Sequence, residues 1–247
     1  MSEIAARAQK AGLTGVAFTD HVEWVPEDEA YEYLDPSTYF VELERLRARY
    51  KGVLTLLAGI EAGSPHRFPA ETNALLRAWP WDIVIGSAHW VDGLAGWEPV
   101  AFKAGLEAAY ERYFQELVVL TREGNYDILG HLDIVRRDSW ALFQQVLPLE
   151  PYADLIRQAL RYSVQRGKGL EINTSGWRYR LPDPLPGLLV LRWYRELGGE
   201  ILVFGSDAHS PEAIAWEFER ARALALEAGF TRLARFEQRR VVDWLRL

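Results

Sequence analysis

One module recurs along the chain and constrains its fold more than any other feature. An amphipathic segment is followed by a glycine that can end a helix in the left-handed conformation, and then by a short apolar run rich in β-branched residues. This glycine stands at Gly12, Gly124, Gly167 and Gly198. We expect six buried strands, at Gly15–Thr19, Leu54–Ile60, Ile83–Ile85, Asp127–Leu129, Leu170–Ile172 and Ile201–Phe204.

The segments between these runs are expected to be helices. Asp35-Pro36 and Ser210-Pro211 each place a capping side chain before a proline at the first helical position, and Ala213–Glu227 has an amphipathic pattern. Strands that alternate with helices, without a long Pro/Gly/Ser linker, predict parallel βαβ units in one domain over residues 1–247. The predicted fold class is α/β, either a barrel or a doubly wound sheet.

The ends of the six runs favour the barrel, because every run stops at a side chain that can bind a metal or a ligand. In a (β/α) barrel the carboxyl ends of all strands meet at one mouth, so these side chains are predicted to share one site. The run ends carry Asp20, His21, Glu61, His89, His131, Asp133, Asn173, Asp207 and His209.

Each of these residues also has an ordinary structural interpretation. A single histidine at a strand end is more often a hydrogen-bonded structural residue than a ligand, and Asp or Asn there usually forms a turn. However, four of the five histidines take the same topological position, and Asp207-Ala208-His209 puts two potential ligands on one side of a strand end. The joint pattern predicts a metal site, and we expect His66 to have a surface or supporting role.

The residue types define the chemistry of such a site. The chain has no cysteine, so the ligands are imidazoles and carboxylates, which suit Zn, Mn or Fe. Glu61 can bridge two ions, and two or three ions can share a hydroxide that attacks phosphorus. A phosphate also needs a positive partner, for which Arg178 is our first candidate, while Arg136 and Arg137 are weaker ones.

The charge and hydropathy of the chain exclude several classes of partner. The formal net charge is −7 over 247 residues, so there is no overall basic footprint for nucleic acid or an anionic membrane. No apolar run approaches the roughly 20 residues of a membrane span, and the first residues lack the apolar stretch of a signal peptide. We expect a cytoplasmic protein that acts on a small phosphate ester.

The ordered motifs resemble those of the polymerase and histidinol phosphatase (PHP) family, and within it the histidinol-phosphatase members. The resemblance runs from Ile4 to about Phe230. It implies a distorted, TIM-like (β/α)7 barrel with a trinuclear metal site that hydrolyses L-histidinol phosphate to L-histidinol and phosphate in histidine biosynthesis. The motifs are Thr19-Asp20-His21, Gly59-Ile60-Glu61, Gly86-Ser87-Ala88-His89, Gly130-His131-Leu132-Asp133, Asn173 to Arg178, and Ser206-Asp207-Ala208-His209.

The resemblance assigns roles to individual residues of this chain. Glu61, Asp207 and His209 would act in catalysis through the metals that they bind. Arg178 would contact the phosphate, and Arg136 matches a position that is often basic in similar chains. The implied metal ligands are His21, Glu61, His89, His131, Asp207 and His209.

One departure from the family pattern concerns the start of the chain. The family opens with a strand ending in His-x-His, which this chain lacks because its first segment is already helical. Either the native protein starts roughly 20 residues earlier, the length of a strand and its loop, or this is a divergent form that has lost a metal. We favour the earlier start, since every other ligand position is present. For the chain as given, we expect weakened or absent occupancy of the ion that depends on the missing pair.

Other functions remain open at this point. The same motifs serve phosphodiesterases and nucleotide phosphatases, and a non-catalytic metal- or phosphate-binding homologue would keep the fold. The acidic charge balance favours a small substrate over nucleic acid. The sequence does not distinguish among Zn, Mn and Fe, nor does it define the oligomeric state.

Overall fold

A computed structural model describes residues 1–247 and contains one six-stranded parallel sheet. Its strand order is β1-β2-β3-β6-β7-β8, and every neighbouring pair is parallel. The predictions of an α/β fold with a parallel sheet and of its six strands are confirmed. The strands are β1 (Gly15–Val22), β2 (Thr55–Gly63), β3 (Ile83–Ser87), β6 (Ile128–Leu129), β7 (Gly169–Asn173) and β8 (Leu202–Gly205).

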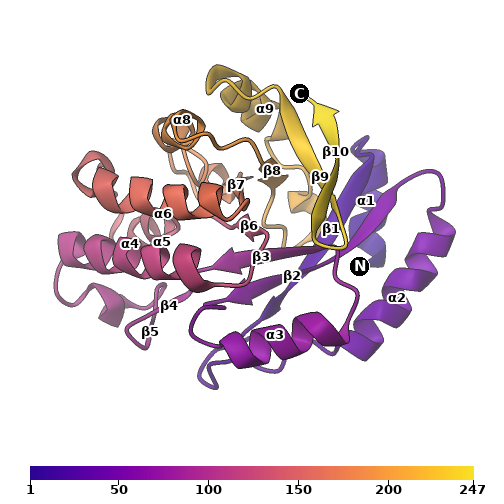
Figure 1. Ribbon diagram of the computed structural model, residues 1–247, viewed down its shortest axis with the longest axis horizontal. Helices are drawn as coiled ribbons and strands as arrows, with labels where there is room; N and C mark the ends of the chain where they lie inside the picture. The colour runs from indigo at the N-terminus through magenta and orange to yellow at the C-terminus, as the bar shows by residue number, and fades with distance from the viewer.

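Helices surround this sheet, which Figure 1 shows at the centre of the molecule. They connect successive strands, as the alternating pattern predicts. The α-helices are α1 (Ser2–Lys10), α2 (Pro36–Arg49), α3 (Pro69–Ala78), α4 (Leu106–Glu123), α5 (Val135–Phe143), α6 (Ala153–Gln165), α7 (Ser175–Arg178), α8 (Leu188–Glu196) and α9 (Phe218–Glu227). The remaining elements are the 3-10 turns η1 (Pro99–Phe102), η2 (Glu150–Tyr152) and η3 (Pro211–Ala213), and the hairpins β4 (Trp90–Val91) with β5 (Leu94–Ala95) and β9 (Arg232–Glu237) with β10 (Arg240–Arg246).

The helix termini match the sequence signals at some positions and differ at others. Asp35 caps α2 by accepting the Ser37 backbone N–H at 3.0 Å, as predicted. Gly124, in contrast, has a φ of −63°, so the prediction of a left-handed stop there is wrong. A β-carbon at Gly124 would lie 2.8 Å from the Leu120 carbonyl oxygen, so glycine is needed for this close approach instead.

The predicted helix Ala213–Glu227 is shorter than expected. Ser210 and Pro211 begin only the short turn η3, and Ser210 makes no side-chain capping bond. Ala215 and Glu217 then take positive φ angles of 57° and 56°, which a right-handed helix cannot accommodate. The helix therefore starts at Phe218, after this irregular segment.

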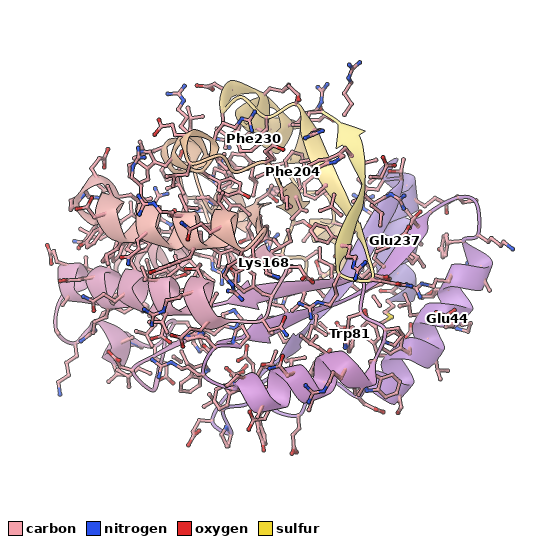
Figure 2. All side chains as sticks on the ribbon, in the orientation of Figure 1. Glu44, Trp81, Lys168, Phe204, Phe230 and Glu237 are labelled. Carbon is pink, nitrogen blue, oxygen red and sulfur yellow. The ribbon has the colours of Figure 1, made fainter.

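The core lies between the sheet and the surrounding helices. Trp81, labelled in Figure 2, packs against Tyr39 and Phe40 of α2 with ring centroids 5.4 and 4.9 Å apart. Leu43 and Leu46 of the same helix are fully buried. These contacts hold α2 against the segment that leads into β3, and each buried large side chain contributes about 1.5–3 kcal/mol relative to exposure.

The sheet is curled into a half-barrel and does not close. Its edge strands are β1 and β8, between which lies a cavity of about 1470 Å³. The β9–β10 hairpin lies beside β8 (Figure 1), and residues of both of its strands line the cavity. The cavity is lined by β1, β8, the hairpin and the carboxyl ends of the strands. The histidines and carboxylates of the strand ends form its mouth.

The opposite, amino-terminal end of the sheet carries a set of paired charges. Asp82 and Asp127 directly precede β3 and β6, and each accepts backbone and side-chain hydrogen bonds. Arg239, in the turn between β9 and β10, donates to both carboxylate oxygens of Asp127 at 2.9 Å. Arg47 donates to Asp82 at 2.7 Å. We call these four residues the amino-end network.

Candidate metal centre

The predicted ligands come together because parallel strands end at the same edge. His21 is paired in register with Glu61 on the neighbouring strand β2. His89 and His131 follow β3 and β6, and Asp207 follows β8. All six predicted metal ligands, including His209, line the one large cavity.

Glu61 is the centre of this group. Its Oε1 lies 2.8 Å from His131 Nε2 and 3.2 Å from His89 Nε2, and its Oε2 lies 3.8 Å from His21 Nδ1. The Ser87 hydroxyl also donates to Oε1, at 2.7 Å. Three imidazole nitrogens thus face one buried carboxylate.

These contacts shift the pKa values of the group in opposite directions. Burial raises the pKa of Glu61, but the charge of His21 and the hydrogen bonds to His131 and His89 outweigh burial and hold it well below its usual range. Burial lowers the pKa values of His89 and His131, but their contacts with carboxylates outweigh it and raise both. These contacts therefore favour the anionic form of Glu61 and the protonated forms of His89 and His131.

The second half of the site follows β8. Asp207 has a positive φ of 48°, a conformation that costs energy for a non-glycine residue. Its Oδ1 lies 3.1 Å from His209 Nε2, and its Oδ2 accepts from Arg137 Nη1 at 2.8 Å. The His209 ring is 5.6 Å from the His21 ring, so this pair adjoins the Glu61 cluster.

The three candidate arginines have different environments. Arg178 donates to the backbone oxygens of Ser206 and Asp207, at 2.6 Å each, and so supports the segment that carries Asp207. Arg137 lines the cavity, whereas Arg178 does not. Arg136 is buried outside the cavity lining, where it pairs at 3.2 Å with both Asp133 and Asp183.

His66 lies outside the site. Its Nε2 is 2.5 Å from Glu116 Oε1 of α4, and Arg67 pairs with the same carboxylate. Neither His66 nor Glu116 lines the cavity. His66 is therefore not the surface residue that the sequence allowed, since its side chain is 2% exposed, and its hydrogen-bond partner is Glu116 and not a predicted metal ligand.

Two buried glutamates at the site were not predicted from the sequence. Glu23 Oε1 lies 2.5 Å from His89 Nδ1. Glu171 of β7 accepts the His131 backbone N–H at 2.9 Å, and burial raises its pKa to about 7. Side-chain alternation offered a signal for Glu23, because a residue two positions after His21 in extended chain lies on the same side.

The donor set fits a divalent metal. Donor atoms of His21, Glu61 and His89 all lie within 4.8 Å of one another, and His131 adds a third nitrogen, the fourth donor, beside Glu61. Nδ1 of His131 is buried and has no hydrogen-bond partner. Imidazole and carboxylate without thiolate is a set that zinc, manganese and iron accept.

Comparisons with known proteins agree with this site. The model of the PHP domain family matches residues 1–175. A histidinol-phosphatase from Lactococcus lactis is 28% identical over 228 residues, which cover 91% of this chain and 84% of the relative. A probable histidinol-phosphatase from Deinococcus radiodurans is 30% identical over 227 residues, covering 89% and 84%.

A solved structure extends the similarity to the whole fold. The crystal structure of histidinol phosphate phosphatase from Lactococcus lactis, complexed with zinc, L-histidinol and phosphate, superposes with a TM-score of 0.86. It is 25% identical and covers 98% of this chain and 92% of that one. Separately, no helix in the present structure combines the length and apolarity that crossing a membrane requires.

Proposed function

Because the chain belongs to the PHP domain family, we propose that it is a phosphomonoesterase that hydrolyses L-histidinol phosphate to L-histidinol and phosphate. The observation that carries this proposal is the Glu61 cluster, with three imidazole nitrogens around one buried carboxylate at the mouth of the sheet. The proposal is also supported by the similarity of the fold to that of a phosphatase whose structure holds zinc, L-histidinol and phosphate.

We assign the metal ligands to the cluster and its neighbours. Glu61 would bridge two ions, held further by His89 and His131 on one side and by His21, Asp207 and His209 on the other. Two or three zinc, manganese or iron ions fit this set. Bound ions supply Lewis-acid chemistry, which neutralises the phosphate oxygens and lowers the pKa of a water.

Two arginines close to the site would bind the phosphate. Arg137 lines the cavity and pairs with Asp207, so its guanidinium is the cation best placed for a phosphate oxygen. Arg178 would be a second phosphate contact. It donates two hydrogen bonds to backbone carbonyl oxygens, which leaves three of its five N–H donors for a phosphate. Arg136 lies outside the cavity lining, which makes Arg137 the stronger assignment.

The chain's own groups also shape the reaction. Hydrolysis forms a bond from a water oxygen to phosphorus and breaks the ester P–O bond, and the leaving alkoxide takes up a proton. The hydrogen bond from Ser87 orients the Glu61 carboxylate, and Arg178 holds the backbone that carries Asp207. These contacts fix the groups around the reacting phosphate before substrate arrives.

The proposal is tested by phosphate release from L-histidinol phosphate in the presence of zinc or manganese. We expect turnover that chelation abolishes and that Glu61→Gln removes, with Glu116→Gln as a matched buried variant that retains activity. Faster release from a nucleoside monophosphate than from L-histidinol phosphate would refute the proposed substrate. Activity unaffected by chelation would refute the metal mechanism.

A further inference from the structure

Glu23 makes a contact that the metal assignments do not use. Its Oε1 lies 2.5 Å from Nδ1 of His89, whose other nitrogen, Nε2, lies 3.2 Å from Glu61 Oε1. The Glu23 side chain is only 2% exposed. His89 is therefore held between two carboxylates, one on each ring nitrogen.

The backbone around Glu23 is arranged to admit its side chain. Glu23 directly follows β1 and forms an isolated bridge with Tyr31, which keeps the chain extended there. Gly63, at the end of β2, lies against the carboxylate, and a β-carbon at that position would overlap both Glu23 carboxylate oxygens. The close approach to Gly63 fixes where the carboxylate can lie.

A histidine presents a lone pair to a metal on one nitrogen while the other carries the proton. A carboxylate that accepts from the far nitrogen fixes both the tautomer and the ring orientation, and makes the near nitrogen more basic. With Glu23 on Nδ1, the near nitrogen is Nε2, which faces Glu61. The geometry has the form of a carboxylate–histidine–metal arrangement.

We propose that Glu23 is a positioning residue that holds His89 with Nδ1 protonated and Nε2 directed at the metal shared with Glu61. The inference rests on the proposed function only in taking His89 as a metal ligand. It assigns Glu23 no contact with the substrate and no place among the ligands. The alternative is that Glu23 and His89 form a buried pair that only supports the fold.

A second buried Glu–His contact provides the matched control. His66 Nε2 lies 2.5 Å from Glu116 Oε1, in a similarly enclosed place outside the cavity. Loss of either contact should destabilise the protein, because a buried partner is left unpaired. Only loss of the Glu23 contact should change zinc binding if our proposal is correct.

The experiment compares zinc affinity in metal-free wild type, Glu23→Leu, Glu23→Gln and Glu116→Leu, by competition with a chromophoric chelator. We expect Glu23→Leu to bind zinc about 10- to 100-fold more weakly. Glu23→Gln keeps an acceptor for the Nδ1 proton and should recover most of that affinity. Glu116→Leu should bind zinc like the wild type.

Nitrogen-15 NMR of the imidazoles adds a readout that a purely structural role would not change. In zinc-loaded wild type and Glu23→Gln we expect a protonated Nδ1 and a metal-bound Nε2 for His89. If Glu23→Leu does not fold, the Glu23→Gln spectrum and affinity still decide the question. A Glu23→Leu protein with wild-type zinc affinity, or Glu23→Gln with the other tautomer of His89, would overturn the proposal.

Failure of the proposed function gives a different result. If zinc binds and depends on Glu23 as expected while L-histidinol phosphate releases no phosphate, the substrate assignment is wrong and the role of Glu23 stands. If the wild type binds no zinc, both proposals are overturned.

Discussion

The two ends of the sheet use similar residues in opposite ways. At the amino end, each aspartate of the amino-end network meets an arginine, and Asp127 receives both of its arginine hydrogen bonds at 2.9 Å. At the carboxyl end, one carboxylate is shared among three imidazoles and a hydroxyl, and a buried nitrogen of His131 has no partner. The first arrangement is complete without a ligand, whereas the second has donors that a metal would use.

This difference separates stability from function. Paired charges at the amino end connect strands, α2 and the C-terminal hairpin, so their removal should affect folding. The carboxyl end carries the backbone strain at Asp207 and the crowded titratable groups, which are typical of functional sites. The predictions below test this division.

The largest effect is expected for Glu61→Gln. The amide removes the charge that all three imidazoles share, so metal occupancy and phosphate activation should both be lost. We expect kcat/KM for L-histidinol phosphate to fall about 10³-fold or more. Steady-state phosphate release and zinc content by mass spectrometry measure this, with Glu116→Gln as control. Full zinc loading in Glu61→Gln would contradict the bridging role.

The adjacent residues Arg136 and Arg137 should give opposite phenotypes. Arg137→Met removes the cation at the cavity and should lower kcat/KM about 10- to 100-fold, the effect of one or two charge-assisted hydrogen bonds. Arg136→Met leaves Asp133 buried without its partner and should cost about 3 kcal/mol of stability. Kinetics and urea unfolding of both variants separate the effects. A larger kinetic loss in Arg136→Met would reverse the assignment.

Arg239→Ala tests the amino end. It leaves the Asp127 carboxylate without its bidentate partner, and because Arg239 is partly exposed we expect a loss of about 2–3 kcal/mol in the free energy of unfolding. The exposed pair Arg192–Glu227 is the control, since Arg192→Ala should cost less than about 1 kcal/mol. Denaturant unfolding measures both. Activity of folded Arg239→Ala should equal that of the wild type, and a loss would show that the two ends are coupled.

The sequence was sufficient to predict the six strands and the meeting of their carboxyl ends at one mouth. Apolar runs define the strands, and parallel connection places all carboxyl ends at one mouth, so His21, Glu61, His89 and His131 could be brought together before any coordinates were known. The order of six motifs added the family and the function. Each of these inferences depends on local patterns or on topology alone.

The details that the sequence did not reveal depend on packing between distant segments. Glu23 and His89 are 66 residues apart, so no local pattern reveals their contact. Arg136 and Arg137 are neighbours on α5, where successive side chains point about 100° apart, and only the surrounding carboxylates show which one faces the cavity. The helix expected from Ala213 was interrupted by left-handed residues that the amphipathic pattern did not indicate.

The smallest expected effect is the pH dependence of the metal-free protein. The pKa values of His89 and His131 are raised above the ordinary 6.5. The stability that these two histidines add to the metal-free fold is therefore complete below pH 6.5 and is lost as the pH rises through the raised pKa values. The pKa of Glu61 is lowered from 4.5, so the stability that Glu61 adds is complete above pH 4.5 and is lost as the pH falls through the lowered pKa. The cluster therefore stabilises the metal-free fold most between the two ordinary pKa values, 4.5 and 6.5.

Thermal unfolding in the presence of a chelator tests this. From pH 6 to pH 9 we expect the wild-type Tm to fall, by about 2–4 °C for each kcal/mol lost, and to fall less in Glu61→Gln, where the shared carboxylate is absent. Zinc should reverse the trend, because it binds neutral imidazoles and is favoured as protons leave. A metal-free Tm with equal pH dependence in both proteins would show that the imidazoles at the carboxyl end are not coupled to Glu61, and the contrast between the two ends would then rest on the amino end alone.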